Sequence, residues 1–254
     1  MTNQKVLFIT GAGSGLGQLT AKRALAGGWA VAAMDINASG LAQLGESPKL
    51  LKLVVDITDP AAVEAAVDRC ETELGPITRL TNAAAIMPLG LLNEQPRELI
   101  MMIMAINFGG MVNIVKIALP RLMTRGSGEF VSYASMAGHW PLIYMGAYNA
   151  AKHAVAAFTE VLYHETRNSG VRIVCVCPPI VATPLLEQAK GTVWPKIFNV
   201  FPPIAPEAVL DEIERILPGK ALWVFPGPLT RVSWWLRRWI PGMLWWRVHQ
   251  IEGI

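Results

Sequence analysis

Three side chains in the middle of the chain are spaced for acid–base chemistry. Tyr148 and Lys152, in "AYNAAKHA", are four residues apart and therefore share one face of a predicted helix. Ser135 lies 13 residues before Tyr148, where an apolar strand-like run ends. A phenol is a poor base at neutral pH, but a neighbouring ammonium lowers its pKa by stabilising the phenolate. These residue types predict proton transfer by Tyr148, with Ser135 holding a substrate oxygen by a hydrogen bond.

A glycine-rich turn near the N-terminus supplies a second type of chemistry. Residues 10–17, "TGAGSGLG", place four glycines at alternate positions directly after the apolar run "KVLFI". In a strand-turn-helix unit such glycines allow a tight turn and let backbone N–H groups approach a pyrophosphate at the positive end of the helix. A plain loop would explain the glycines equally well, so the turn alone does not identify a ligand.

Asp35 strengthens the dinucleotide interpretation of that turn. It ends the next strand-like run, "VAAMD", 18 residues after Gly17, where its carboxylate can accept hydrogen bonds from both adenosine ribose hydroxyls. The carboxylate would also repel a 2′-phosphate, and no Lys or Arg stands at 12–16 or 36–39 to neutralise one. NAD(H) is therefore favoured over NADP(H), and hydride transfer is predicted to accompany the proton transfer. The alternative is a solvated Asp35 that starts a turn.

Strand-like and helix-like segments alternate along the chain, which predicts one doubly wound parallel sheet covered by helices on both faces. The fold class is thus α/β and Rossmann-like, with about seven strands in a single domain over 1–228 and a Trp/Arg-rich tail over 229–254. The predicted strands are 5–9, 30–34, 51–55, 79–82, 129–133, 171–177 and 221–225. The predicted helices are 16–27, 60–74, 98–124, 148–168 and 206–216.

Composition excludes several classes of protein. The chain has 254 residues, of which 52% are hydrophobic and 16% charged, enough for one sizeable core. Its net charge of +3 comes from residues 222–254, which is too small and local for a nucleic-acid interface. Cys70, Cys175 and Cys177 form neither a disulfide framework nor a metal site, so a reducing cytoplasm is expected. No signal peptide and no run long enough to span a membrane is expected.

Taken in order, these motifs resemble those of the classical short-chain dehydrogenases/reductases over about residues 4–225. The matching stretches are "TGAGSGLG", Asp35, "VVDITD", "TNAAA", "AIN", Ser135, "YNAAK" and "CPPIVAT". The resemblance implies that Tyr148 is the general acid/base, that Ser135 orients and polarises the carbonyl or hydroxyl, and that Lys152 binds the nicotinamide ribose. It also implies that Asn107 holds a water that links Lys152 to solvent.

The resemblance also implies the cofactor contacts. Asp56 and Ile57 are expected beside the adenine, Asn82 and Ala84 along the adenosine ribose, and Ile180 and Thr183 beside the carboxamide. The whole expected cofactor set is Gly11, Ser14, Gly15, Leu16, Gly17, Asp35, Asp56, Ile57, Asn82, Ala84, Tyr148, Lys152, Pro178, Ile180 and Thr183. Two departures are Ala85 and Pro179, where the family carries glycine, and both are expected to stiffen the backbone near the cofactor.

Bulky apolar residues are expected to form the substrate walls. They lie in "MAGHWPLIYMG" (136–146) and in a predicted substrate loop over 183–205, with few charges to hold a phosphate or carboxylate. The expected substrate contacts are Trp140, Leu142, Met145, Leu185 and Trp194. They indicate a lipophilic secondary alcohol or its ketone, unless they pack a dimer or a lid instead. His139 is expected to be an exposed loop residue.

The tail, "LTRVSWWLRRWIPGMLWWRVHQIEGI", predicts an amphipathic helix that Pro241 and Gly242 break into two pieces. A basic, tryptophan-rich helix suits a peripheral contact with a membrane surface. It suits equally well a face that packs on a partner subunit. By resemblance the helices over 98–124 and 148–168 pair across a homodimer or homotetramer axis, although their apolar faces would also suit core helices.

The sequence therefore predicts an NAD(H)-dependent oxidoreductase that interconverts a lipophilic secondary alcohol and its ketone. No metal and no nucleic acid is expected to take part. Two alternatives remain at this point. One is an NADPH-dependent ketoreductase, and the other is a non-catalytic dinucleotide-binding protein that its tail holds on a membrane or in a complex.

Overall fold

A seven-stranded, fully parallel sheet forms the centre of the molecule. The computed structural model describes residues 4–253, apart from the side chain of Lys190. The strand order is β3-β2-β1-β4-β5-β6-β7, which is the doubly wound arrangement that the alternating pattern predicts. The strands are β1 (Val6–Thr10), β2 (Ala30–Asp35), β3 (Leu50–Val54), β4 (Arg79–Asn82), β5 (Gly128–Tyr133), β6 (Val171–Val176) and β7 (Trp223–Val224).

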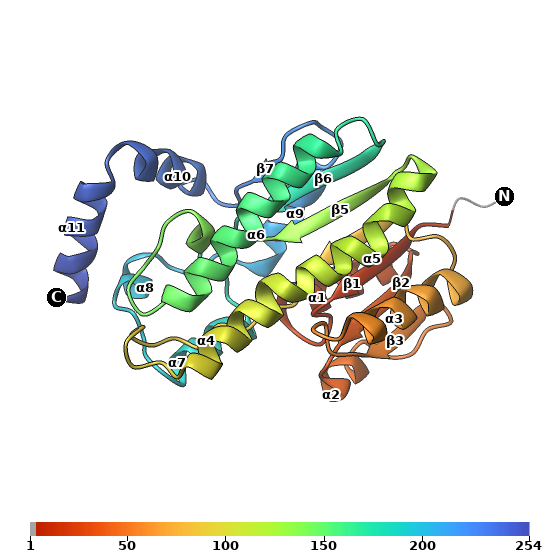
Figure 1. Cartoon of the computed structure of the whole chain (residues 1–254), viewed down its shortest axis with the longest axis horizontal. Coiled ribbons are helices and arrows are strands. Elements are labelled where there is room, and N and C mark those ends of the chain that lie inside the picture. The colour runs from red at the N-terminus through yellow and green to blue at the C-terminus, as the bar shows by residue number, and fades with distance from the viewer. Residues whose placement is uncertain (1–3, 254) are drawn as a thin grey trace.

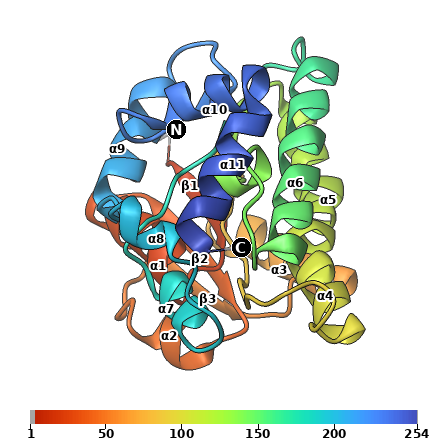
Figure 2. The same ribbon diagram turned by 90° about the vertical axis from the view of Figure 1, so that its left-hand side faces the viewer.

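Helices cover both faces of this sheet (Figure 1). Figure 2 shows α5 and α6 on one side of it and α1 and α9 on the other. The main helices are α1 (Gly15–Ala26), α2 (Ala38–Ala42), α3 (Pro60–Glu73), α4 (Arg97–Met104), α5 (Gly110–Arg125), α6 (Gly146–Glu165) and α9 (Pro206–Ile216). The predicted single-domain α/β fold is confirmed.

The core lies on both faces of the sheet because side chains alternate along each strand. In β1, Phe8 packs toward α3 and α5, whereas Leu7 and Ile9 pack toward α1. The central strands β1 and β2 are buried on both faces, so they are apolar almost throughout instead of alternating with polar residues. This explains why the short apolar runs of the sequence mark the strands so clearly.

The predicted helix over 98–124 is a composite element. It consists of α4, a π-helical turn η1 (Ala105–Gly109) and α5, and it is continuous from Arg97 to Arg125. By length and composition this helix is apolar enough to cross a membrane, so the expectation that no run reaches that length is wrong. Its buried side chains, Met111, Ile114 and Leu119 among them, nevertheless pack against the sheet. A core helix of a globular protein passes the same test of length and composition, and 33% of the most apolar part of this helix is buried.

The segment after β6 builds a layer beyond the sheet. It contains α7 (Pro184–Lys190) and α8 (Ile197–Val200), and the chain ends with α10 (Thr230–Trp239) and α11 (Pro241–Glu252). The predicted break at Pro241 and Gly242 is confirmed. The C-terminal helix returns to α8 (Figure 2), where the Glu252 carboxylate accepts hydrogen bonds from the backbone N–H of Ile197 at 2.9 Å and of Lys196 at 3.1 Å.

Candidate active site

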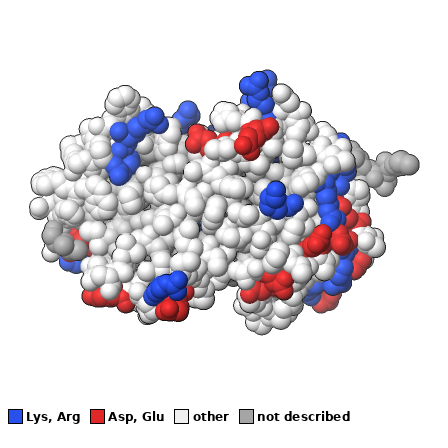
Figure 3. Space-filling model, viewed as in Figure 1, with Lys and Arg blue, Asp and Glu red and all other residues white. Residues whose placement is uncertain are grey.

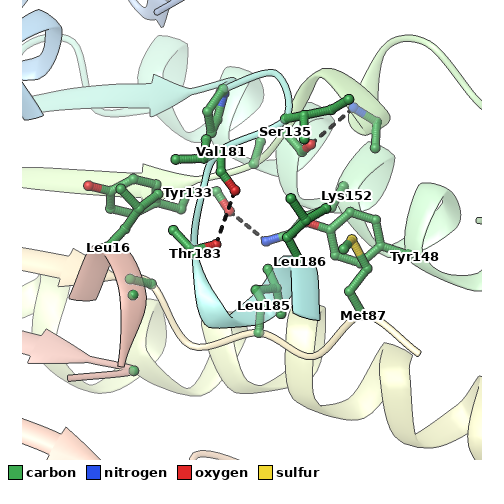
Figure 4. A pocket seen from close by; sticks show the side chains of 18 of the residues that line it. Leu16, Met87, Tyr133, Ser135, Tyr148, Lys152, Val181, Thr183, Leu185 and Leu186 are labelled. Atoms are coloured by element: carbon green, nitrogen blue, oxygen red, sulfur yellow. Dashed lines mark hydrogen bonds between the residues drawn. The ribbon is translucent and has the colours of Figure 1, made fainter. Parts of the chain in front are cut away.

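A cavity of about 690 Å³ opens at the carboxyl ends of the strands, where doubly wound sheets bind their ligands. It extends from the glycine-rich turn, past the ends of β2 and β5, to the segment after β6 (Figure 4). The expected contacts that line it are Gly11, Ser14, Gly15, Leu16, Gly17, Asp35, Asp56, Ile57, Ala84, Ser135, Trp140, Leu142, Met145, Tyr148, Lys152, Pro178, Ile180, Thr183 and Leu185.

The glycine-rich turn has the tight geometry that its sequence predicts. Gly11 has a φ of 68°, and a Cβ added there would lie 2.7 Å from the backbone nitrogen of Ala84. A Cβ on Gly17 would collide with the carbonyl oxygen of Gly11. Helix α1 then begins at Gly15, and the side chain of its N-cap residue, Ser14, makes no capping hydrogen bond. The positive end of α1 therefore faces the cavity with side chains small enough to admit a pyrophosphate.

Asp35 is held at the rim of this turn. Its Oδ2 accepts a hydrogen bond from the N–H of Gly13 at 2.8 Å, and its Oδ1 accepts one from the N–H of Asn37 at 2.8 Å. Among the described residues that line the cavity, the charged ones are Asp35, Asp56 and Lys152. The adenosine end of the site therefore carries negative charge only, which fits a ribose with free hydroxyl groups.

Ser135 and Tyr148 meet at the inner part of the cavity. Ser135 follows β5, and its Oγ accepts a hydrogen bond from the N–H of Ala137 at 3.1 Å, which fixes the side chain. Burial raises the pKa of Tyr148 to about 12, and a hydrogen bond with Ser135 opposes that rise. At neutral pH the phenol is consequently protonated and can donate its proton.

Lys152 is buried one helical turn after Tyr148. Its Nζ donates a hydrogen bond to the carbonyl oxygen of Tyr133 at 2.8 Å and lies 5.7 Å from the centroid of the Tyr148 ring (Figure 4). Burial lowers the pKa of Lys152 to about 8. In the protein alone, burial dominates the pKa of Tyr148, and the expected lowering of the phenol pKa is not found.

The side chain of Asn107 is engaged by the backbone beside the cavity, and the expected role of this residue in holding a water stays a prediction. Asn107 is fully buried in η1, its Oδ1 accepts a hydrogen bond from the N–H of Ile86 at 2.8 Å, and its Nδ2 donates one to the Ile86 carbonyl oxygen at 2.9 Å. Both polar ends of the amide are thus engaged by one backbone unit. Asn107 is a positioning residue that ties the π-turn to the cavity wall beside Ile86, and it is absent from the lining itself.

The side chain of Asn82, which was expected along the ribose, also lies outside the cavity. Asn82 is 2% exposed and does not line the cavity, and its Oδ1 accepts a hydrogen bond from the hydroxyl of Thr10 at 2.9 Å. The Thr10 hydroxyl accepts hydrogen bonds from the N–H groups of Ala83 and Ala84 at 3.1 and 3.2 Å. Asn82 and Thr10 therefore join the ends of β1 and β4 and position the wall that Ala84 forms. Thr10 was not among the expected site residues.

Trp194 is the one expected substrate contact that does not line the cavity. Its indole packs edge-on against Phe198 with ring centroids 5.3 Å apart, and its Nε1 donates a hydrogen bond to Asn199 at 2.9 Å. Phe198 lines the cavity in its place. Both aromatic residues lie in the predicted substrate loop, and sequence alone does not show which of them faces inward. Further apolar residues that line the cavity and were not expected there include Met87, Leu186 and Ile197.

Ala85 and Pro179, which were expected to stiffen the backbone near the cofactor, both line the cavity. Among the described residues the only one other than glycine with a positive φ is Tyr144, at 67°. The backbone at both positions is therefore compatible with a side chain.

His139 is not the exposed residue that was expected. Its ring packs against Trp223 and Trp234, with centroids 5.0 and 6.2 Å away, and its Nε2 lies 3.4 Å from the Sγ of Cys177. Burial lowers the pKa of His139 to about 4. It is a neutral packing residue outside the cavity.

The fold and the site together define a dinucleotide-binding oxidoreductase. The family described as short chain dehydrogenase matches residues 5–193, and the chain belongs to that family. The chain is 32% identical over 192 residues to 2-(R)-hydroxypropyl-CoM dehydrogenase of Xanthobacter autotrophicus, a match that covers 72% of this chain and 77% of the relative. It is also 32% identical over 204 residues to 17-beta-hydroxysteroid dehydrogenase 13 of Mus musculus. That match covers 77% of this chain and 66% of the mouse protein, just under two thirds of its length.

Solved structures show the same fold. A short chain dehydrogenase/reductase from Burkholderia phymatum in complex with NAD has a TM-score of 0.84 at 24% identity, covering 95% of each chain. A short chain dehydrogenase from Burkholderia cenocepacia J2315 in complex with NADP has a TM-score of 0.81 at 24% identity, covering 96% of this chain and 97% of the other. The family and this fold support a nicotinamide dinucleotide as the cofactor, in either of its two forms.

Proposed function

We propose that the protein is an NAD(H)-dependent dehydrogenase that interconverts a lipophilic secondary alcohol and its ketone. The observation that carries this proposal is the meeting of Ser135, Tyr148 and Lys152 at the inner end of a cavity that is otherwise apolar there. Belonging to an oxidoreductase family supports the class of reaction.

The substrate end of the cavity supports a lipophilic ligand. Apolar side chains from three separate segments converge on Tyr148, and Figure 4 shows Met87 beside its ring, with Leu185 and Leu186 nearby. The apolar lining residues here are Met87, Trp140, Leu142, Met145, Leu185, Leu186, Ile197, Phe198 and Phe201. Apart from Lys152, which the Tyr133 carbonyl engages, no charged side chain among the described lining residues lies at this end. A carboxylate or phosphate on the substrate would therefore lack a partner.

Each polar group at this end then has a defined task. Ser135 donates a hydrogen bond to the substrate oxygen and holds it beside the Tyr148 hydroxyl. In the direction of reduction, Tyr148 donates its phenolic proton to that oxygen, and in the direction of oxidation it accepts the proton. The raised pKa of Tyr148 keeps the proton-donating form populated at neutral pH. When bound, the dinucleotide supplies the hydride acceptor or donor, and its oxidised ring adds a positive charge that favours the phenolate.

Lys152 serves this exchange through its position and its pKa. The carbonyl of Tyr133 fixes the ammonium beneath the Tyr148 ring, where it can bind a ribose hydroxyl. With a pKa of about 8, the amine exchanges protons close to physiological pH and can return a proton toward Tyr148.

Asp35 supports NAD(H) as the form of the cofactor. Its carboxylate is fixed on the glycine-rich turn by Gly13. Neither lysine nor arginine lines this end of the cavity among the described residues. A 2′-phosphate would meet a carboxylate without a compensating cation, whereas ribose hydroxyls would find an acceptor.

The test is the absorbance at 340 nm when the enzyme is given NAD⁺ or NADP⁺ with a panel of hydrophobic secondary alcohols and with polar, charged ones. We expect NADH to form with the hydrophobic alcohols and NAD⁺. A faster reaction with NADP⁺ would overturn the assignment of the cofactor, and turnover of charged alcohols alone would overturn the substrate class. Absence of turnover with every alcohol and ketone in the panel, while NADH binds, would favour a binding protein without catalysis.

A further inference from the structure

The two C-terminal helices display an unusual number of apolar side chains to solvent. Six of the fifteen large apolar side chains that are exposed in the described part of the chain lie between residues 229 and 246, and each of the six is 51% to 65% exposed. All the tryptophans in that exposed set are among them. We call these residues the tryptophan face: Leu229, Val232, Trp235, Trp239, Met243 and Trp246.

Side chains outside the tryptophan face pack α10 and α11 against the rest of the protein. Trp234 packs against Phe225 with ring centroids 5.5 Å apart, and Trp245 packs in the cluster of apolar residues that surrounds the cavity. Glu252 joins the end of α11 to α8. By contrast, Trp235 has Trp239, another member of the face, as its ring neighbour at 5.9 Å. Exposed apolar groups in this number mark an interaction surface.

The charge around the tryptophan face is of one sign. Arg231, Arg238 and Arg247 are exposed on the same two helices, and they make no ion pair with any residue that the structure describes. The sequence holds no Asp or Glu from 215 to 251. Figure 3 shows basic side chains over α10 on a surface that is otherwise mostly uncharged. The surface therefore complements an anionic, partly apolar partner.

An anionic membrane has this chemistry, and a second copy of the chain lacks it. A symmetric contact through this face would bring arginines against arginines without any carboxylate from the same segment. A lipid surface instead offers phosphate groups to the arginines and a headgroup layer in which indole rings are stable. With ten and twelve residues, α10 and α11 suit a position in the plane of the surface. We infer that the tryptophan face docks the protein on anionic phospholipid bilayers.

The docked face adjoins the mouth of the cavity. Leu229 belongs to the tryptophan face and also lines the cavity. Two further residues at the start of α10, Thr230 and Ser233, line the cavity without belonging to that face. A lipophilic substrate dissolved in the bilayer would thus reach the site without crossing bulk water. This consequence rests on the proposed function, whereas the docking itself does not.

The experiment is co-sedimentation of the full chain with phosphatidylglycerol vesicles and with phosphatidylcholine vesicles. We expect the wild-type protein to bind the phosphatidylglycerol vesicles more strongly. The variant Trp235→Ser/Trp239→Ser/Trp246→Ser should bind them about tenfold more weakly. Arg231→Gln/Arg238→Gln/Arg247→Gln should lose the preference for phosphatidylglycerol. The matched control is Met101→Ser/Met102→Ser on α4, which removes apolar side chains that are 52% and 46% exposed and should bind like the wild type.

Because all the substituted side chains are exposed, the variants should keep the thermal unfolding temperature of the wild type. Sedimentation equilibrium without vesicles then tests whether a second copy of the chain covers the tryptophan face instead. A wild-type protein that stays in the supernatant, or a tryptophan variant that sediments as well as the wild type, would overturn the inference. A wild-type oligomer that the tryptophan substitutions dissociate, without any binding to vesicles, would assign the face to a second copy of the chain and also overturn it.

Discussion

The carboxylate of Asp35 accepts a hydrogen bond from the backbone N–H of Gly13 at 2.8 Å. A Cβ added to Gly13 would lie 2.8 Å from the carboxylate carbon, so the turn and the acidic side chain fit each other only with glycine at this position. Asp35 therefore has two roles that substitution can separate, since it shapes the turn as a hydrogen-bond acceptor and repels a 2′-phosphate through its charge.

The first prediction concerns the form of the cofactor. Asp35→Asn keeps an oxygen that can accept from Gly13 but removes the negative charge. We expect the ratio of kcat/KM for NAD⁺ to that for NADP⁺ to fall by about tenfold to a hundredfold. The reason is that repulsion between the Asp35 carboxylate and a nearby 2′-phosphate contributes about 1–3 kcal/mol to the discrimination between the two dinucleotides. Steady-state kinetics with both dinucleotides measure the ratio.

Asp35→Ala is the companion variant, since it removes the acceptor for Gly13 as well as the charge. It should show the same change of ratio together with a higher KM for both dinucleotides. Retention of the wild-type ratio in Asp35→Asn would contradict the electrostatic account of the preference.

Much of the fold could be predicted from the sequence because the physical signals are local. Strands buried on both faces are continuous apolar runs, and helix starts such as Asp59-Pro60 carry their own cap and proline. The π-turn at Ala105–Gly109 has no such signal, since it depends on the hydrogen bonds that Asn107 makes with Ile86, 21 residues earlier. The helix around this turn was nevertheless predicted over 98–124, close to its observed bounds at Arg97 and Arg125.

Site residues were predictable where a sequence motif fixes their place on a strand or helix. Ser135, Tyr148 and Lys152 come together because a strand end and one helix face place them there. Trp194 was assigned wrongly because it lies in an irregular segment, where no periodicity shows that its ring turns to Phe198 and Asn199 instead of the cavity. The burial of His139 likewise depends on Trp223 and Trp234, far along the chain. The NAD(H) preference, a homodimer or homotetramer, and a cytoplasmic location stay predictions.

The second testable outcome is a loss of stability in acid that depends on His139. Burial lowers its pKa from 6.5 to about 4, so the unfolded chain binds a proton in this range that the folded protein does not. The share of the free energy of unfolding that depends on neutral His139 is complete above pH 6.5 and is lost as the pH falls from there toward 4. Between about pH 7 and about pH 5 the wild type should lose about 2 kcal/mol of its free energy of unfolding through this group.

His139→Phe should lack that share of the loss, because phenylalanine suits the aromatic cluster and does not titrate. The free energy of unfolding of each variant is measured by urea unfolding at the two pH values. The other titrating groups contribute equally to the wild type and the variant, so they cancel in the difference. The exception is the neighbouring His153, which also lowers the pKa of His139. His164→Gln, at an exposed position, is the matched control and should follow the wild type. An equal acid sensitivity of His139→Phe and wild type would show that His139 is not the group responsible.

A third prediction concerns Glu252, which is 6% exposed and accepts hydrogen bonds from the backbone N–H groups of Lys196 and Ile197. Glu252→Ala leaves both N–H groups without this acceptor, at a cost of about 1–3 kcal/mol for each one that stays buried. Because Ile197 and Phe198 line the cavity, we expect a several-fold higher KM for a hydrophobic alcohol with kcat nearly unchanged.

The control for that measurement is Glu98→Ala, since Glu98 lies at the exposed start of α4 with its side chain 81% exposed. This variant should keep the wild-type KM. If Glu252→Ala also kept it, the contact between α11 and α8 would have no part in shaping the substrate end.

The most direct test of the account is hydride transfer by Tyr148→Phe, which removes the phenolic hydroxyl and keeps the ring. We expect NADH to bind as it does to the wild type and kcat to fall by about 10²- to 10⁴-fold, because the proton has lost its donor and acceptor. Tyr144→Phe, in the adjacent loop, should retain turnover. Turnover of Tyr148→Phe at the wild-type rate, measured at 340 nm with a hydrophobic secondary alcohol, would contradict the role of Tyr148 as the general acid/base.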